Sequence, residues 1–293
     1  MFTNIQILNT VNNSNILLET NIKDTGIVLT HFKDNQLSGE FNKVKGINQN
    51  GSTLNSALLG ERDIDVEGVI VANNREQIEV IKRMMILTLN PLNDVIITYS
   101  DGIVNKEITG RASFVPRFSS DYKLNNNYLL GFNLSFDCFN PYWRDTEDTV
   151  INIGTWISNF EFPFELEYQG IEFATKGPNE IEFINYGEIE SPLEIIFLGP
   201  ALNPKIILND KEFIKVNKTI LDQETLYIST SYGNKKVEIV KSNGVVENAY
   251  NYIDIFSNFF KLPIGLNKIT YSTDEGHIPQ SVLIKYKNQY LSL

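Results

Sequence analysis

Gly-Asn-Lys-Lys at residues 233–236 is followed downstream by Ser-Asn-Phe-Phe-Lys-Leu-Pro-Ile-Gly-Leu-Asn at residues 257–267, and a last alternating segment then runs to Tyr290. Asn/Gly turns between segments in which apolar and polar residues alternate are typical of antiparallel strands. Such segments recur through this half of the chain, at residues 180–184, 193–198, 225–229, 236–240 and 281–286. Their spacing favours a β-sandwich.

The clearest strand of the N-terminal half lies at residues 62–71. Ile64, Val66 and Ile70 fall on one face, and the acidic residues at 63, 65 and 67 fall on the other, because successive side chains of a strand point to opposite faces. β-branched residues separate the acids, and position twelve of a calcium loop counted from Asp63 would be Asn74 rather than Glu. We therefore predict a charged outer strand face, not a calcium site.

One long helix is predicted over residues 75–89. Asn74 can cap its N-terminus, and Gln77 can reach back toward the cap backbone, as in a capping box. Pro91 then prevents the helix from continuing. Together with the surrounding strands, this helix predicts a mainly β N-terminal domain, a β-sandwich plus one helix.

The predicted helix carries more apolar residues than one sheet face needs. Positions 78, 81, 85 and 89 form a stripe that is expected to pack on the sheet. Val80, Met84 and Leu87 widen the apolar arc beyond this stripe. We therefore expect a second burial surface, against another subunit, with Ile78, Val80, Met84 and Leu87 as interface candidates.

Length and composition bound the class of protein. A chain of 293 residues with 42 % hydrophobic residues predicts two domains, which we place at 1–140 and 141–293 because the Pro-interrupted segment 140–145 separates them. The net charge of −11 argues against tight binding to nucleic acid. No apolar run is long enough to span a membrane, and residues 1–5 lack the features of a secretory signal. We expect synthesis and retention in a cytoplasm.

The sequence contains no recognisable catalytic or metal-binding constellation. P-loop, nucleophile-elbow, dinucleotide-binding and zinc signatures are missing, and the only histidines, His31 and His277, lie in different predicted domains. Cys138 is the single cysteine, so no disulfide can form within the chain, and its apolar neighbours predict a small buried side chain. We expect no enzymatic activity, no cofactor and no metal.

Aromatic residues gather around the predicted domain boundary, at positions 142, 143, 156, 160 and 162. Two interpretations remain open. The rings could cover the seam between two domains, which we favour, or they could form a platform on which a saccharide stacks. Trp143 and Trp156 are the candidate saccharide contacts.

Several blocks with distinctive turn residues follow one another in the C-terminal half. In chain order they are a Pro-aromatic junction, a Gly-Pro and Asn-Pro turn, a hairpin in two parts and two closing blocks, at residues 140–143, 199–206, 226–230, 232–237, 257–267 and 286–291. These blocks resemble the distal tail proteins of tailed bacteriophages. Ser229-Thr230 departs from the Asp-Thr that many members carry. The N-terminal half resembles the family's belt domain without a sharp motif.

This resemblance implies a structural role at the tail tip. In the family, the N-terminal domain forms a hexameric ring around the tail channel, and the C-terminal domain is a galectin-like β-sandwich that acts as a docking arm. The implied partners are further copies of the chain, the tail tube protein, a tail-associated lysin or hub protein and a receptor-binding protein. DNA would pass through the ring without binding tightly, and no membrane is involved.

The implied location is the distal end of the tail in the virion, with assembly in the host cytoplasm. Two alternatives remain open beside this interpretation. One is a saccharide-binding module that contacts the host cell wall, and the other is the equivalent hub protein of a contractile or bacteriocin-like particle.

Overall fold

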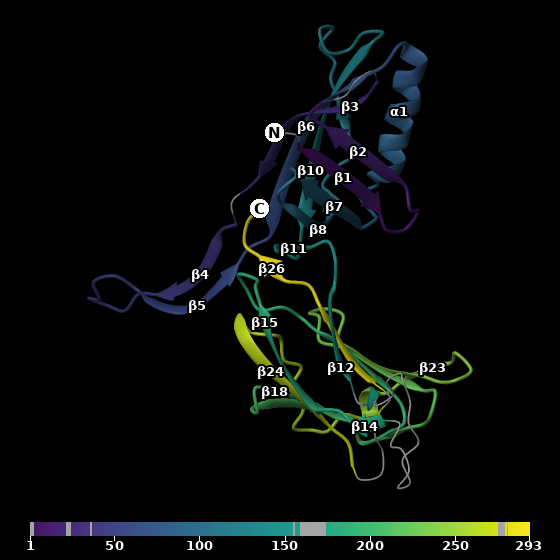
Figure 1. Ribbon diagram of the computed structural model, residues 1–293. Helices are drawn as coiled ribbons and strands as arrows, with labels where there is room; N and C mark the ends of the chain where they lie inside the picture. The colour runs from purple at the N-terminus through teal and green to yellow at the C-terminus, as the bar shows by residue number, and fades with distance from the viewer. Residues whose placement is uncertain are drawn as a thin grey trace. The chain divides into compact units, whose positions relative to one another are not determined.

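The computed structural model describes residues 3–21, 25–35, 37–154, 156–158, 174–274, 279 and 281–293, without the side chains of residues 154, 156–158 and 174–176. The chain forms two compact units (Figure 1). The first comprises Met1–Thr146 together with Tyr290–Leu293, and the second comprises Glu147–Gln289. Mainly β structure with one α-helix agrees with the fold class expected from the sequence.

The division differs from the expected boundary at 140/141 in two ways. The chain leaves the first unit only after Thr146, and it returns to that unit at Tyr290. The physical reason for the first difference is Trp143, which is fully buried in the hydrophobic core of the first unit and therefore draws the junction segment into it.

Nearly all strands of the first unit belong to one ten-stranded sheet. Its order is β26-β11-β8-β7-β1-β2-β3-β6-β10-β9, and an additional pairing of β8 with β10 closes the middle seven strands into a barrel. The strands are β1 (Asn4–Asn9), β2 (Asn15–Glu19), β3 (Gly26–Asp34), β6 (Arg62–Val71), β7 (Val95–Ser100), β8 (Asn105–Ala112), β9 (Arg117–Phe118), β10 (Leu129–Cys138), β11 (Trp143–Asp145) and β26 (Gln289–Tyr290).

The barrel core follows from strand alternation. Ile64, Val66 and Ile70 of β6 are buried, as their period of two predicts, whereas Asp63 and Glu67 are exposed. Strand β6 pairs with β3 on one side and with β10 on the other. The predicted charged outer face of this strand is confirmed.

Helix α1 (Arg75–Thr88) packs against β1, β2 and β6. The Asn74 side chain accepts a hydrogen bond of 2.9 Å from the Gln77 backbone N–H. The Gln77 side chain reaches back to the backbone N–H of Asn73, one residue before the cap, at 3.0 Å. The predicted N-terminus and its cap are therefore confirmed, with the return bond displaced by one residue.

Replacing Asn74 by Ala should destabilise the protein by about 1 kcal/mol, because the first turn of α1 loses a capping acceptor. Urea unfolding followed by circular dichroism measures this loss. Asn73→Ala is the matched control, since the Asn73 contact uses only its backbone N–H. Equal stability of the two variants would contradict the capping role.

The second unit is a sandwich of two antiparallel sheets. One has the order β12-β25-β16-β21-β22-β23 and the other β15-β24-β18-β19. These strands are β12 (Thr149–Gly154), β15 (Glu180–Asn185), β16 (Glu194–Leu198), β18 (Lys205–Leu208), β19 (Glu212–Lys215), β21 (Thr225–Ser229), β22 (Lys236–Val240), β23 (Val246–Asn248), β24 (Gly265–Ser272) and β25 (Ser281–Tyr286). Short strands complete the unit: β13 (Trp156–Ser158) pairs with β14 (Ala174–Lys176), and β17 (Ala201–Leu202) with β20 (Thr219–Ile220). Phe197, Ile228 and Ile284 are among its buried core residues.

A cluster of polar contacts, here called the polar clamp, surrounds the Glu247 carboxylate in this unit. Glu247 on β23 accepts contacts from Lys218 at 2.5 Å, from Lys241 at 2.9 Å and from the Tyr252 hydroxyl of the 3₁₀ helix η1 (Tyr250–Tyr252) at 3.2 Å. The Lys218 ammonium also lies 4.0 Å from the centre of the Tyr252 ring. The hydrogen bonds from Lys218 and Lys241 lower the pKa of Glu247 to about 2.

This shift predicts an acid-sensitive clamp. Because the folded pKa lies below the ordinary value of 4.5, the stabilisation by Glu247 is present above that pH and is lost as the pH falls towards about 2. The difference in Tm between the wild type and Glu247→Gln should therefore be full at neutral pH and vanish near pH 2. A difference that stays constant across this range would refute the clamp.

Candidate functional site

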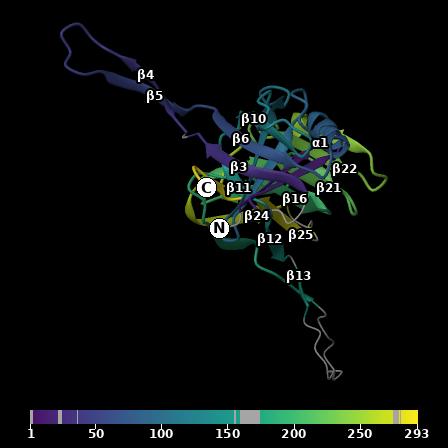
Figure 2. The same ribbon diagram turned by 90° about the horizontal axis from the view of Figure 1, so that it is seen from above.

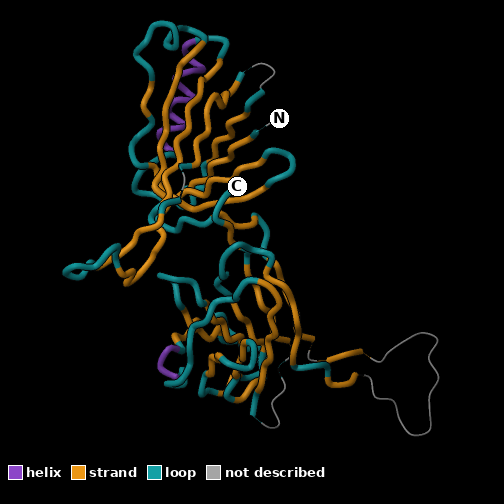
Figure 3. The backbone as a smooth tube through the Cα atoms, turned by 90° about the vertical axis from the view of Figure 1, so that its left-hand side faces the viewer, coloured by secondary structure: helices purple, strands orange, loops and turns teal. Residues whose placement is uncertain are grey.

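A long hairpin of the first unit stands outside the barrel. It consists of β4 (Gly39–Val44) and β5 (Thr53–Leu59), and every residue of both strands is exposed. Figures 2 and 3 both show it extending away from the barrel strands. The two strands pair only with each other among the described residues, as a two-stranded sheet of their own.

The hairpin has two chemically different faces. Register pairs Phe41 with Ala57 and Lys43 with Leu54, and Leu59 lies opposite Gly39, so that these residues share one face. The Phe41 ring covers Gly39, where an added Cβ would meet it at 2.6 Å. Phe41 is 61 % exposed and Leu54 57 %. An apolar face of this kind has no cover within the described part of the subunit.

The opposite face of the hairpin is more polar. Register places Glu40 opposite Leu58, Asn42 opposite Ser56 and Val44 opposite Thr53 on this face, which therefore mixes polar residues with the exposed Leu58 and Val44. A β-bulge follows Asn42, where the register shifts by one residue. Bulges increase the twist of a strand pair, which here turns the tip relative to the root.

The strands of the closed barrel are paired on both sides, whereas each strand of this hairpin keeps one edge unpaired within the part of the chain that the structure describes. A closed barrel removes edges, whereas an exposed strand edge offers unpaired N–H and C=O groups to another chain. The outer edges of β4 and β5 remain free among the described strands. Free edges together with an apolar face are properties of a surface that binds another protein chain.

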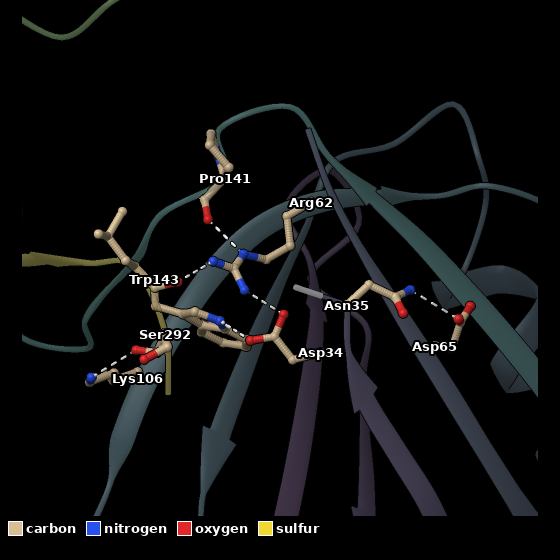
Figure 4. Close-up of polar contacts among 9 residues, drawn as sticks. Asp34, Asn35, Arg62, Asp65, Lys106, Pro141, Trp143 and Ser292 are labelled. Carbon is tan, nitrogen blue, oxygen red and sulfur yellow. Dashed lines mark hydrogen bonds and ion pairs between the residues drawn. The ribbon is translucent and has the colours of Figure 1, made fainter. Parts of the chain in front are cut away.

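The root of the hairpin is a buried polar node (Figure 4). Arg62, at the start of β6, is 2 % exposed and contacts the Asp34 carboxylate, at the end of β3, at 2.5 Å. Its Nε donates to the Pro141 carbonyl at 2.7 Å, and its Nη2 donates to the Leu291 carbonyl at 2.5 Å. Asp34 also accepts a hydrogen bond of 2.9 Å from the Trp143 indole N–H. Every charged group in this node therefore has charged or polar partners, as burial of a charge requires.

The position of Trp143 overturns its candidacy as a saccharide contact. Its side chain is fully buried, and its indole N–H is committed to Asp34. A ring on which a sugar stacks must be exposed, whereas Trp143 packs in the core of the first unit. The side chain of Trp156 lies outside the described residues.

Trp143→Phe should destabilise the protein by about 2 kcal/mol, because hydrogen bonds to charged groups contribute roughly 1.5–3 kcal/mol and Asp34 would lose one of them. Chemical denaturation measures the change. Tyr142→Phe is a suitable control on the neighbouring residue, because the Tyr142 hydroxyl makes no hydrogen bond with the residues that the structure describes. A loss as small as that of the control would rule out a contribution from the indole N–H.

The interface candidates on α1 divide into two groups. Ile78 is fully buried against the barrel and has no surface to offer. Val80 is 69 % exposed, Leu87 60 % and Met84 39 %, so these three side chains lack cover within the described subunit. Val80 and Leu87 also line a groove of about 680 Å³ along the helix.

The described residues offer little that could carry out chemistry. They contain no group of three or more His, Cys, Asp or Glu side chains placed to hold a metal ion. Cys138 is fully buried, and burial raises the pKa of its thiol to about 12, which confirms the sequence-based expectation of a buried, unreactive side chain. His31 is exposed on β3, and His277 lies outside the described residues. None of the described helices is long and apolar enough to cross a membrane.

Neither the hairpin nor the node is among the features predicted from the sequence. The available signal was the apolar set at positions 41, 54, 58 and 59 beside the Asn50-Gly51 turn. The bulge after Asn42 breaks the period of two, and this weakens that signal.

The barrel, the sandwich and the uncovered hairpin are features of a structural protein that assembles with other protein chains. Comparison with protein families agrees. Residues 12–138 match the phage tail protein RIFT-related domain, and residues 186–290 match the siphovirus-type tail component, C-terminal domain. The chain belongs to the siphovirus-type distal tail proteins and is a structural component of the phage tail.

Solved structures share the fold along almost the whole chain. The crystal structure of the SPP1 Dit protein, described as a paradigm of the hub adsorption apparatus in phages that infect Gram-positive bacteria, aligns with a TM-score of 0.66 at 15 % identity, covering 97 % of this chain and 98 % of that one. Chains of the phage P2 baseplate in its activated conformation align at 0.53 with Ca and 0.54 with Sr, at 11 % and 12 % identity, each covering 98 % of both chains. A search of curated proteins finds no match.

Proposed function

We propose that this tail component is the ring-forming hub that joins the tail tube to the adsorption apparatus. The observation that carries the proposal is the β4–β5 hairpin, whose apolar face and free edges have no partner within the described subunit. A monomer that exposed such a surface would be prone to aggregation, so the surface must be covered in the assembled particle. The fold shared with hub and baseplate proteins supports this role.

A ring requires two different complementary patches on each subunit, because its contacts are head-to-tail. The hairpin supplies one patch. We propose that the outer side of α1, with Val80, Met84 and Leu87, contributes to a second contact surface, since these residues are exposed and apolar. A hexamer is the subunit number that family membership suggests.

Charge on the outer face of the barrel fits a ring through which DNA passes. Asp63 and Glu67 are exposed on β6, and none of the ion pairs among the described residues involves them or Asp65. Asp65 instead accepts hydrogen bonds from neutral groups, Asn35 at 3.1 Å and Ser135 at 2.8 Å. Lys33 lies opposite Asp65 on β3, so the net negative charge of this face comes from Asp63 and Glu67, and it would disfavour tight binding of DNA phosphates.

The partners that we propose are further copies of this chain, the tail tube protein, a tail-associated lysin or second hub protein, and a receptor-binding protein. The site of action is the distal end of the tail, after assembly in the host cytoplasm. Siphovirus-type family models favour a long non-contractile tail over a contractile or bacteriocin-like particle. Burial of Trp143 leaves the direct saccharide-binding alternative without one of its two candidate residues.

The double variant Phe41→Ser, Leu54→Ser tests the hairpin. Both residues lie on its apolar face, and the loss of a single hot-spot contact costs about 2 kcal/mol, so ring formation should weaken at least about 30-fold. Native mass spectrometry and negative-stain microscopy of the purified protein and of tails measure the rings. Leu87→Ser in the same assay tests the helix face.

Asn42→Ala with Ser56→Ala is the matched control, because these two residues form a pair on the opposite, polar face of the same hairpin. This control should assemble like the wild type. Rings that persist in the Phe41, Leu54 variant would exclude the hairpin from the contact. A strictly monomeric protein in purified wild-type tails would overturn the proposed function itself.

A further inference from the structure

The chain returns to the first unit for its last described residues. Tyr290–Leu293 follow directly after the second unit, which ends at Gln289. The Lys106 ammonium lies 3.7 Å from the centre of the Tyr290 ring and donates a hydrogen bond of 3.2 Å to the Ser292 carbonyl. Leu293 packs against the core of the first unit. We call residues 290–293 the C-terminal tail.

The tail lies at the root of the β4–β5 hairpin. The hairpin leaves the barrel between Asp34, where β3 ends, and Arg62, where β6 begins. Leu37 and Leu59, on the two arms of the root, line a cavity of about 380 Å³ together with Leu291 and Ser292 of the tail. Root and tail are therefore neighbours, although more than two hundred residues of sequence separate them.

One buried guanidinium joins the root to the tail. Arg62 contacts Asp34 through Nη1 and donates to the Leu291 carbonyl through Nη2, both in the fixed geometry of the guanidinium fork (Figure 4). If the tail departs, Nη2 of a side chain that is 2 % exposed loses its acceptor, and the node must rearrange or admit water. The ion pair at the hairpin root would change in the same event.

The same guanidinium also bonds to the backbone near both points where the chain passes between the two units. Its Nε bonds to the Pro141 carbonyl, shortly before the outgoing crossing at Thr146 and Glu147. Its Nη2 bonds to the Leu291 carbonyl, directly after the returning crossing at Gln289 and Tyr290.

We propose that the C-terminal tail is a latch which, through Arg62, holds the root of the β4–β5 hairpin in its extended position. Release of the tail removes the acceptor of Arg62 Nη2 and thereby loosens the root of the hairpin. This coupling goes beyond the proposed ring and does not depend on it, because all contacts of the latch lie within one subunit.

Two backbone hydrogen bonds report on the root. The Gly60 N–H donates to the Ser38 carbonyl at 3.0 Å, and the Asn35 N–H donates to the Asp63 carbonyl at 3.0 Å. Hydrogen–deuterium exchange of these amides measures opening of the root directly. Amides of β1 and β7, which lie elsewhere in the barrel sheet, report on general loss of stability.

The main variant is a chain that ends at Tyr290, which lacks the Leu291 and Ser292 carbonyls. We expect the Gly60 and Asn35 amides to exchange at least tenfold faster than in the wild type, with β1 and β7 unchanged. Ser292→Ala is the matched control, because it removes only an exposed hydroxyl and keeps the backbone carbonyls that Arg62 and Lys106 use, so it should exchange like the wild type. All variants are compared in the same oligomeric state, verified by light scattering.

Lys106→Met provides a second route should the shortened chain fail to fold. It removes the contacts of the lysine to Tyr290 and Ser292 but leaves Arg62 intact, so it should accelerate exchange of the same two amides by a smaller factor. Unchanged root amides in both variants would refute the latch. Acceleration shared equally by β1 and β7 would also refute it, because it would indicate general destabilisation.

Discussion

The structure of the first unit depends on the burial of one cation. A guanidinium withdrawn from water must find a carboxylate and further acceptors, and Arg62 finds them on segments that are far apart in the sequence, at Asp34, Pro141 and Leu291. Because Arg62 needs these acceptors, the end of β3, the start of β6, the junction segment and the C-terminal tail all meet at its guanidinium. The hairpin leaves the barrel at that same point, so its position depends on this node.

The barrel and the hairpin differ in how far their apolar residues and strand edges are exposed to solvent. Closure of the sheet through β8 and β10 leaves the barrel without open edges, and its apolar residues are packed inside. The β4–β5 hairpin has the reverse properties, with free edges and exposed Phe41 and Leu54. A rigid barrel that carries one uncovered hairpin suits a protein that acts by joining others in a tail.

Much of the fold could be predicted from local pattern. The strand at residues 62–71, the helix with its Asn74 cap and the alternation of the C-terminal strands all depend on neighbours within a few residues. The candidate site was less predictable. Arg62 could not be told from an ordinary solvated arginine, because its partners lie 28, 79 and 229 residues away. Ile78 and Val80 are both apolar helix residues, and only the packing direction separates them.

The sequence by itself determined the mainly β class, the single long helix, the lack of recognisable catalytic motifs and the resemblance to phage distal tail proteins. Each of these depends on residue type, turn chemistry and short-range periodicity. Only the tertiary structure decided that Trp143 lies inside the barrel unit, that residues 39–59 stand out in solvent and that the tail returns to Arg62. Burial and exposure arise from contacts between distant segments, and no local pattern encodes which segments meet.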